Sequence, residues 1–203
     1  MSPLLESLKL NDGVIQNLNY HQDRLNRSMD ELFSIAEKID LMKIISIPDD
    51  CKSGIYKIRI LYGPTVDKIV IEPYHYRSIQ SLKVVSHESI DYHLKFTNRE
   101  QLDVLFAQRG DCDDIIIVKN GYLTDSYSAN LLFFDGSKWF TPSTPLLKGT
   151  KRQLLLDQGI ITEKEISEVD ILNFQKIGLI NAMIDFEEMP VLSVERISTI
   201  PKF

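Results

Sequence analysis

The sequence predicts a mixed α/β (α+β) fold made of two small domains. Strand-length apolar runs such as residues 115–118 and 131–134 alternate along the chain with segments that have a helical apolar period. The chain has 203 residues, 43% of them hydrophobic, which is enough to bury a core and permits one large domain or two small ones. A polar connection at residues 87–91 is the candidate boundary. We therefore expect an N-terminal α+β domain at 1–86 and a C-terminal α/β domain at 87–203.

The first half predicts one helix and several strands. Asp12-Gly13 lies between two short apolar runs and predicts a hairpin over residues 8–15. Residues 54–62 alternate between apolar and polar side chains, which predicts a strand, with a return strand at 68–71 and a further strand at 81–86. A helical stripe predicts a helix from about residue 21 to 38, with apolar residues at Leu25, Met29, Leu32, Phe33, Ala36 and Ile39.

The second half predicts helices and a strand meander. Asn98 is a candidate N-cap for a helix that reaches about residue 108 and stops at Gly110. Residues 115–118, 131–134 and 138–140 predict a three-stranded meander. A helix is expected at 150–158, and the pattern Thr-Glu-Lys-Glu at 162–165 is a capping box that predicts another. The last strands are expected at 179–183 and 191–194.

Composition narrows the class of protein. The net charge is −6 and Lys and Arg are scattered, which argues against nucleic-acid and membrane-surface partners. No apolar run approaches the roughly 20 residues that span a bilayer, and the N-terminus lacks the pattern of a signal peptide. Cys51 and Cys112 have no metal spacing and are expected to be free thiols, and the four histidines predict no metal site. We expect a cytoplasmic protein.

Three elements in chain order carry the candidate chemistry. Lys95 follows Leu94 at an expected strand end, where desolvation would favour the neutral amine that attacks a carbonyl. Asp125 lies at a strand end and could hold a pyridine nitrogen protonated. Gly149 precedes an expected helix, where the amides of Thr150 and Lys151 could bind a phosphate. Each alone has an ordinary alternative: a surface lysine, a turn aspartate, a plain helix start.

Arg24 adds a cation to this set. It lies near one face of the first expected helix together with His21 and Ser28. A guanidinium at this place could bind a phosphate through two hydrogen bonds, although such an arginine is commonly a salt-bridged surface group. An amine, a carboxylate and a phosphate site are what a pyridoxal phosphate (PLP) enzyme needs from its protein.

In its order of motifs the chain resembles the class IV (fold-type IV) PLP enzymes, which include the branched-chain and D-amino-acid aminotransferases and 4-amino-4-deoxychorismate lyase. The resemblance covers almost the whole chain. It opens with Glu6-Ser7-Leu8-Lys9-Leu10, Asp12-Gly13 and His21-Gln22-Asp23-Arg24-Leu25. The run from His93 to Lys95 followed by Asn98-Arg99 resembles the lyase branch, as do residues 180–183 and 189–191.

The resemblance implies roles for particular residues. Lys95 would hold PLP as a Schiff base and then move the substrate's α-proton. Arg24 would bind the phosphate, helped by Thr150, Lys151 and the turn at Asn181-Ala182, while Asp125 would bind the ring nitrogen. Arg59 is the nearest candidate for the substrate carboxylate and could equally be an exposed strand residue. The cofactor would lie in the cleft between the domains, in a homodimer whose active sites lie near the interface.

Three features depart from the family pattern. Asp125 stands where the family usually carries glutamate, which is one methylene longer. Lys151 replaces the usual threonine of the phosphate turn, with the hydroxyl one place earlier at Thr150. The chain is also short, mainly in its first half. The expected function is an aminodeoxychorismate lyase of folate biosynthesis that releases pyruvate and 4-aminobenzoate. A class IV aminotransferase of a branched-chain or D-amino acid and a non-catalytic family member are the alternatives.

Overall fold

The computed structural model describes residues 3–33 and 38–198, which form two compact units. Unit 1 contains residues 1–76 and 94–98, and unit 2 contains 77–93 and 99–203. The chain therefore first passes from unit 1 to unit 2 between residues 76 and 77, ten residues before the expected boundary at 86/87. Lys95, expected in the C-terminal domain, belongs to unit 1, and the strand expected at 81–86 belongs to unit 2.

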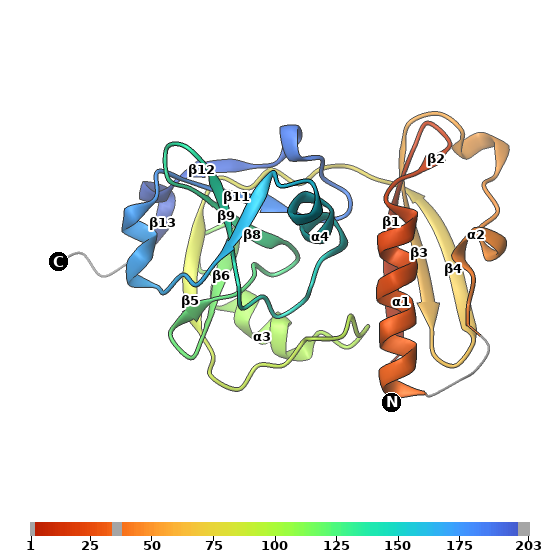
Figure 1. Cartoon of the computed structure of the whole chain (residues 1–203), viewed down its shortest axis with the longest axis horizontal. Helices are drawn as coiled ribbons and strands as arrows, with labels where there is room; N and C mark the ends of the chain where they lie inside the picture. Colours follow the sequence, from red (N-terminus) through yellow and green to blue (C-terminus); the bar gives the residue numbers. More distant parts are fainter. Residues whose placement is uncertain (1–2, 34–37, 199–203) are drawn as a thin grey trace. The chain divides into compact units, whose positions relative to one another are not determined.

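Unit 1 is built on a four-stranded antiparallel sheet with the order β2-β1-β3-β4 (Figure 1). The strands are β1 (Leu4–Asn11), β2 (Val14–Ile15), β3 (Ile55–Tyr62) and β4 (Val66–Pro73). The expected hairpin is confirmed, since Asp12 and Gly13 connect β1 to β2 with φ angles of 47° and 78°. Two successive positive φ angles are those of a type I′ turn, whose twist matches the strands that it joins.

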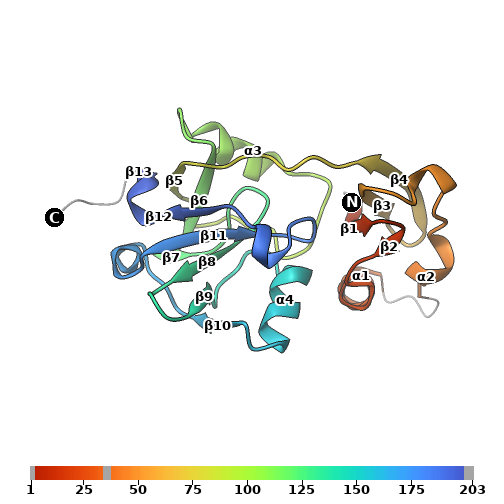
Figure 2. The same ribbon diagram turned by 90° about the horizontal axis from the view of Figure 1, so that it is seen from above.

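One face of this sheet carries the core of unit 1. Leu4, Leu8 and Leu10 of β1 lie on this face and pack with Ile58 and Ile60 of β3. Helix α1 (Leu18–Leu32) lies over this face, as Figure 2 shows from above, and its Leu25 and Met29 belong to this core. The helix begins earlier and ends earlier than the expected range of 21–38. Residues 34–37, which include Ala36 of the expected stripe, lie outside the described residues. Two short elements follow, α2 (Leu41–Ile44) and η1 (Asp49–Cys51).

Unit 2 contains two sheets. The first has the order β13-β5-β6-β7, with β5 (Leu82–Ser86) and β6 (Asp114–Lys119) parallel at its centre. The second has the order β10-β9-β8-β11-β12 and is mainly antiparallel. The remaining strands are β7 (Tyr122–Leu123), β8 (Asn130–Phe134), β9 (Trp139–Pro142), β10 (Ile161–Lys164), β11 (Lys176–Ile180), β12 (Val191–Ser193) and β13 (Ile197–Ser198).

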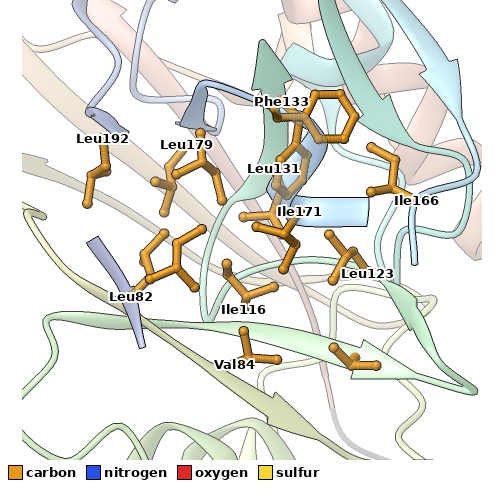
Figure 3. Close-up of a cluster of buried hydrophobic side chains, with 14 residues drawn as sticks. Leu82, Val84, Ile116, Leu123, Leu131, Phe133, Ile166, Ile171, Leu179 and Leu192 are labelled. Atoms are coloured by element: carbon orange, nitrogen blue, oxygen red, sulfur yellow. The ribbon is translucent and has the colours of Figure 1, made fainter. Parts of the chain in front are cut away.

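The main core of unit 2 lies between these two sheets (Figure 3). Side chains of the first sheet, such as Leu82 and Ile116, meet Leu131 and Leu179 of the second. The expected three-stranded meander is therefore wrong, because β6 pairs in one sheet and β8 and β9 pair in the other. Both strands are apolar on successive residues, which is typical of strands buried on both faces, and such runs do not specify their partners.

Two α-helices belong to unit 2. Helix α3 is Glu100–Ala107, and its cap residue is Arg99 instead of the expected Asn98. Helix α4 is Thr150–Asp157 with Gly149 at the N-cap, which confirms the expected helix to within one residue. Leu155 of α4 packs with Leu132 and Ile180 in a second cluster, so α4 covers the face of the second sheet that lies away from the main core. Three short 3-10 helices complete the unit: η2 (Val169–Asn173), η3 (Phe186–Glu188) and η4 (Val194–Arg196).

The helix expected from the capping box at 162–165 is wrong. These residues begin within strand β10, which pairs in parallel with β9, Ile161 opposite Trp139. Glu163, within this pattern, accepts a hydrogen bond from Arg152 of α4. Within the described ranges no helix is long and apolar enough to cross a bilayer. Cys51 and Cys112 are free thiols.

Candidate functional site

Lys95 is held beside the first strand of unit 1. Its carbonyl accepts a hydrogen bond from the amide of Leu5 at 2.9 Å, and Phe96 forms an antiparallel bridge with Leu4. Thr97 continues this contact through its amide, which donates to the carbonyl of Pro3 at 2.8 Å. The short segment 94–98 thus adds to the edge of β1 next to Glu6. The side chain of Lys95 is half-buried, so the expected partial desolvation is present.

Arg24 is paired with Glu6 inside unit 1. The Nε and Nη2 atoms of Arg24 donate to the two carboxylate oxygens of Glu6 at 2.8 and 2.6 Å. Glu6 is fully buried and the side chain of Arg24 is 9% exposed. This bidentate geometry fixes the plane of the guanidinium. The phosphate role of Arg24 stays a prediction, and the surface interpretation of this arginine does not apply.

His21 completes a buried cluster with Glu6 and Arg24. Its Nδ1 lies 2.6 Å from Oε2 of Glu6. Burial lowers the pKa of His21, and the positive charges of Arg24 and Lys95 lower it further, against the opposing effect of Glu6. A neutral imidazole that donates from Nδ1 to the carboxylate agrees with this direction. Burial alone would raise the pKa of Glu6, but the charge and hydrogen bonds of Arg24 and His21 outweigh it and lower the pKa to about 2.

Arg59 lies on the other face of the same sheet. It is half-buried on β3 opposite Ser7 of β1 and Val70 of β4, alternating with the core residues Ile58 and Ile60. Its charge contributes to lowering the pKa of Glu72, after the hydrogen bond of Lys57. The structure therefore separates Arg59 from the Glu6, His21 and Arg24 cluster by the thickness of the sheet. A role of Arg59 toward a substrate carboxylate stays a prediction.

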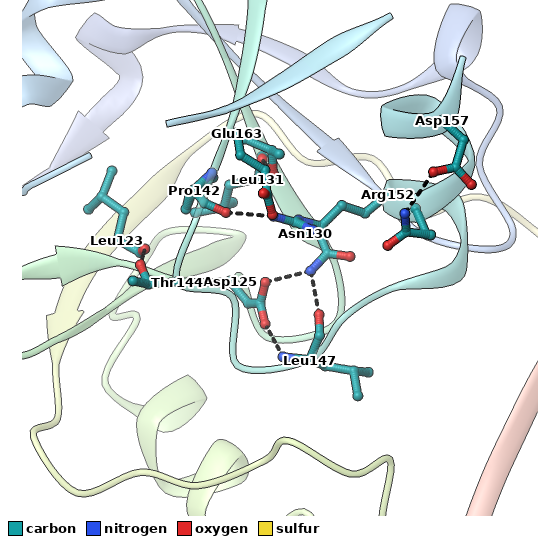
Figure 4. A network of polar contacts seen from close by, with 12 residues as sticks. Leu123, Asp125, Asn130, Leu131, Pro142, Thr144, Leu147, Arg152, Asp157 and Glu163 are labelled. Atoms are coloured by element: carbon teal, nitrogen blue, oxygen red, sulfur yellow. Dashed lines mark hydrogen bonds and ion pairs between the residues drawn. The ribbon is translucent and has the colours of Figure 1, made fainter. Parts of the chain in front are cut away.

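Asp125 is a buried acid of unit 2 (Figure 4). Its Oδ1 accepts a hydrogen bond from the Nδ2 of Asn130 at 2.6 Å, and its Oδ2 accepts one from the amide of Leu147 at 2.9 Å. Asp125 and Asn130 also form an antiparallel bridge just before β8. Each carboxylate oxygen of Asp125 thus accepts a hydrogen bond, which fixes the orientation of the carboxylate. A turn aspartate on the surface does not need to be fixed in this way.

The environment of Asp125 brings its pKa near neutrality. Burial raises the pKa to about 6, against the opposing effects of the Leu147 amide, the Asn130 amide and the charge of Arg152. The carboxylate is therefore ionised above about pH 6 and protonated below it. A buried carboxyl group that titrates near neutral pH is typical of a functional site.

Gly149 opens helix α4 with no space for a side chain. A Cβ atom placed there would lie 2.0 Å from the Oδ1 of Asn130. The φ angle of Gly149 is −68°, so the absence of a side chain is required by this close approach and not by backbone strain. The amides of the first helical turn have no acceptor within their own helix, and they give this end of α4 a partial positive charge.

The side chains of the first turn of α4 hold the helix in place. Lys151 is buried and its Nζ lies 2.9 Å from the Oδ1 of Asp185. Arg152 is 2% exposed, and its Nη2 donates to the carbonyl of Pro142 at 2.9 Å and to Glu163 at 2.5 Å. The Nε of Arg152 is buried with no hydrogen-bond partner among the described residues. A buried arginine with one unused donor keeps a positive charge inside this site.

The turn at Asn181 and Ala182 follows strand β11 and lies near the loop of the acid. The Nδ2 of Asn181 lies 3.4 Å from the carbonyl of Ser128, and its Oδ1 accepts from the amide of Met183 at 2.9 Å. Ser128 belongs to the loop between Asp125 and Asn130. Unit 2 therefore brings together the predicted acid, the glycine-led helix start and the turn at 181–182.

The predicted residues thus fall into two groups. Unit 1 brings Lys95 to the strand that carries Glu6 and places Arg24 against that glutamate, and unit 2 brings together the others except Arg59. Sequence reasoning did not assign roles to Glu6 or Asn130. A signal for Glu6 was present, because it occupies an inward position of a strand whose other inward positions are leucines. Asn130 had no such signal, since its neighbours give no indication of which loops it joins.

The chain belongs to the class IV aminotransferase family, whose sequence profile matches residues 4–194. An uncharacterized protein of Haemophilus influenzae Rd is 41% identical over 185 residues, covering 90% of this chain and 98% of its own length. A crystal structure described as a candidate 4-amino-4-deoxychorismate lyase from Haemophilus somnus 129PT is 35% identical, with a TM-score of 0.84, and covers 90% of this chain and 97% of that one.

A more distant likeness shows the fold alone. A hypothetical aminotransferase from Mycobacterium tuberculosis, in a PLP-bound form, is 16% identical with a TM-score of 0.76, and covers 100% of this chain and 84% of that one. The two Haemophilus proteins match this chain over nearly their whole lengths, so its small size is a property that they share. The expected fold class and family are confirmed.

Proposed function

We propose that this protein is a PLP-dependent lyase that converts aminodeoxychorismate to 4-aminobenzoate and pyruvate. The observation that best supports PLP as the cofactor is the environment of Asp125. Its carboxyl group is buried, has a pKa of about 6 and lies beside a glycine-led helix start. The likeness to the candidate lyase of Haemophilus somnus, over nearly the full length of both chains, supports the substrate. Family membership supports the PLP class.

The donor set of unit 2 fits this cofactor. PLP, when bound, supplies a ring that accepts electrons from the substrate's α-carbon. Asp125 would keep the ring nitrogen protonated, which its carboxylate form does above about pH 6. The first-turn amides of α4 and the turn at Asn181-Ala182 would hold the phosphate, and we also propose a phosphate role for Arg24, as the family resemblance implies. Helix N-termini and arginine both favour a dianion of this kind.

Lys95 would link to the cofactor and carry the proton. Its amine must be neutral to react, and a half-buried position favours that state. The same amine would take the proton from the substrate's α-carbon. Loss of the substrate's side group then gives the lyase outcome, and return of the proton elsewhere gives the aminotransferase outcome. The homodimer and the cytoplasmic location expected from the sequence belong to this proposal too.

The test uses the purified full chain supplied with PLP and aminodeoxychorismate. We expect pyruvate and 4-aminobenzoate to form without any keto-acid acceptor. Amino transfer to a keto acid, with no pyruvate released in its absence, would show a class IV aminotransferase instead. A protein that stays colourless with added PLP would contradict both enzyme functions and favour the non-catalytic alternative.

Two variants assign the roles. Lys95→Ala should lose the borohydride-fixed cofactor and all turnover, while Lys43→Ala, an exposed lysine of the same unit, should behave as the wild type. Asp125→Ala should keep PLP bound and lose turnover, because the phosphate contacts remain while the ring nitrogen loses its partner. Full activity of Asp125→Ala would show that another residue binds that nitrogen.

A further inference from the structure

The side chain of Asn130 contacts both halves of the candidate site in unit 2. Its Nδ2 donates to Oδ1 of Asp125 at 2.6 Å and to the carbonyl of Leu147 at 2.9 Å. The amide of Leu147 in turn donates to the other oxygen of Asp125 at 2.9 Å. Asp125, Asn130 and Leu147 thus form a closed ring of hydrogen bonds, which Figure 4 shows.

The other end of the Asn130 side chain lies against the start of α4. Its Oδ1 occupies the position that a side chain on Gly149 would need, 2.0 Å from an ideal Cβ. Leu147 is two residues before Gly149, so Asn130 contacts the segment that leads into α4 at two points: the backbone carbonyl of Leu147 and Gly149. Because Asn130 is itself buried at the first residue of β8, the sheet fixes its position.

We propose that Asn130 is a positioning residue that holds the carboxylate of Asp125 and the glycine-led start of α4 in one fixed geometry. This inference rests on the proposed PLP site, because that site requires an acid and a phosphate turn at a constant separation. Asn130 touches neither a substrate nor the reacting atoms in this scheme. It acts through Asp125 and Gly149.

The proposal can be tested without the cofactor, because the pKa of Asp125 depends on the groups around its carboxylate. The groups that face its carboxylate are the amide of Asn130, the backbone amides of Leu146 and Leu147, and the guanidinium of Arg152 on α4. Each stabilises the ionised carboxylate. Removal of Asn130 deletes one of these donors, so the pKa of Asp125 should rise further above its usual range.

The first experiment compares Asn130→Ala with Thr141→Val in the PLP-free protein. Thr141 is a matched control, since its buried hydroxyl donates to the carbonyl of Leu131 in the same strand as Asn130 but does not contact Asp125. The carboxyl carbon of Asp125 is followed by NMR through a pH titration. We expect the pKa of Asp125 to rise by about one unit in Asn130→Ala. Thr141→Val should leave it unchanged.

The second experiment uses the steric contact. Gly149→Ala should displace the Asn130 side chain and so raise the pKa of Asp125, although Gly149 itself makes no contact with that carboxylate in this scheme. It should also weaken PLP binding by about tenfold or more, measured by quenching of the Trp139 fluorescence. The double variant Asn130→Ala/Gly149→Ala should be no worse than Asn130→Ala alone, because the space that the new Cβ needs has been emptied.

These outcomes separate the inference from the proposed function. If Asn130→Ala and Gly149→Ala both leave the Asp125 pKa at its wild-type value, the positioning role of Asn130 is wrong. Additive effects in the double variant would also overturn it. If the wild type binds no PLP, the proposed function fails, and the NMR titration still decides whether Asn130 positions Asp125. Should Asn130→Ala not fold, Gly149→Ala and Asn130→Ser provide the same test.

Discussion

Glu6 is the residue on which the charged cluster of unit 1 depends. It is a fully buried carboxylate with three close donor contacts, two from Arg24 and one from His21. An isolated charge in such a place costs several kcal/mol, and two well-paired charges with satisfied hydrogen bonds roughly offset that cost. The pair therefore stabilises the fold little relative to an apolar pair, yet neither partner can be removed alone without a penalty.

Glu6→Gln should make this dependence visible as a loss of stability that varies with pH. Pairing lowers the pKa of Glu6 from its usual 4.5 to about 2 in the folded protein. The folded state therefore holds this proton less tightly than the unfolded chain does, so the stabilisation is complete above about pH 4.5. It is lost as the pH falls toward 2. The lowered pKa of His21 adds to this loss below its usual value of 6.5.

Urea unfolding at pH 7 and pH 3 gives the measurement. At pH 7 we expect Glu6→Gln to lose about 3 kcal/mol of unfolding free energy, and the difference from the wild type should shrink at pH 3. Glu72→Gln is the matched control, because Glu72 pairs with Lys57 on the surface of the same unit and should change stability by less than about 1 kcal/mol. A difference from the wild type that is equal at both pH values would contradict the assignment.

Arg24→Ala should weaken PLP binding, since the variant loses a guanidinium that Glu6 orients. A charged hydrogen-bond donor to phosphate contributes roughly 1.5–3 kcal/mol, which corresponds to about a tenfold to hundredfold rise in Kd. Arg27→Ala is the matched control, because Arg27 is an exposed arginine on the same helix. Equal PLP affinity in Arg24→Ala and Arg27→Ala would show that Arg24 is a structural residue only.

The candidate residues could be predicted from sequence to the extent that they stand in motifs. Lys95, Asp125 and Gly149 were found because their order has a common chemical purpose. The partners that give them their properties were not found, because Glu6 and Asn130 are distant along the chain from the residues that they orient. Charge pairing and steric contact of this kind depend on strand register, which local sequence does not specify.

At the scale of elements, local turn chemistry was predictable and strand partnership was not. The hairpin at Asp12-Gly13 and the turn at Asn120-Gly121 both place two residues at positive φ, as their sequences require. The capping-box pattern at 162–165 was overridden by tertiary structure. Residues Ile161–Lys164 gain a parallel strand partner in β9, and Glu163 accepts a hydrogen bond from Arg152 of α4.

Gly13→Ala should destabilise unit 1 through its turn alone. Gly13 has a φ of +78°, and the nearest atoms to a new Cβ would lie at ordinary contact distances of 3.5 Å and more. The penalty is therefore that of a left-handed backbone, about 1 kcal/mol. Gly63→Ala is the control, since Gly63 has no positive φ and no atom within 4 Å of a new Cβ. The two unfolding free energies, measured side by side in urea, should differ by about 1 kcal/mol. A cost for Gly63→Ala as large as that for Gly13→Ala would contradict the backbone explanation.

At the scale of the whole molecule, each unit has its own core and its own part of the candidate site. Unit 1 holds the lysine and the oriented arginine, and unit 2 holds the acid and the glycine-led helix. Neither set is sufficient for the proposed chemistry, because one supplies the amine and the other supplies the charge that stabilises electrons on the ring. The response of each unit to the cofactor should therefore be measured separately.

Hydrogen exchange measures the response of each unit to PLP directly. A ligand that binds only the native state stabilises whatever it contacts, by an amount that grows with its concentration over Kd. We expect PLP to slow amide exchange in β1 and α1 of unit 1 and also in α4 and β8 of unit 2. Inorganic phosphate, which lacks the ring and the aldehyde, should protect the start of α4 more than the segment around Lys95. In Lys95→Ala, PLP should still protect α4, because the phosphate contacts remain, while protection near residue 95 is lost. If PLP protects α4 and β8 of the wild type no more than inorganic phosphate does, the proposed contact between the PLP ring and Asp125 is wrong.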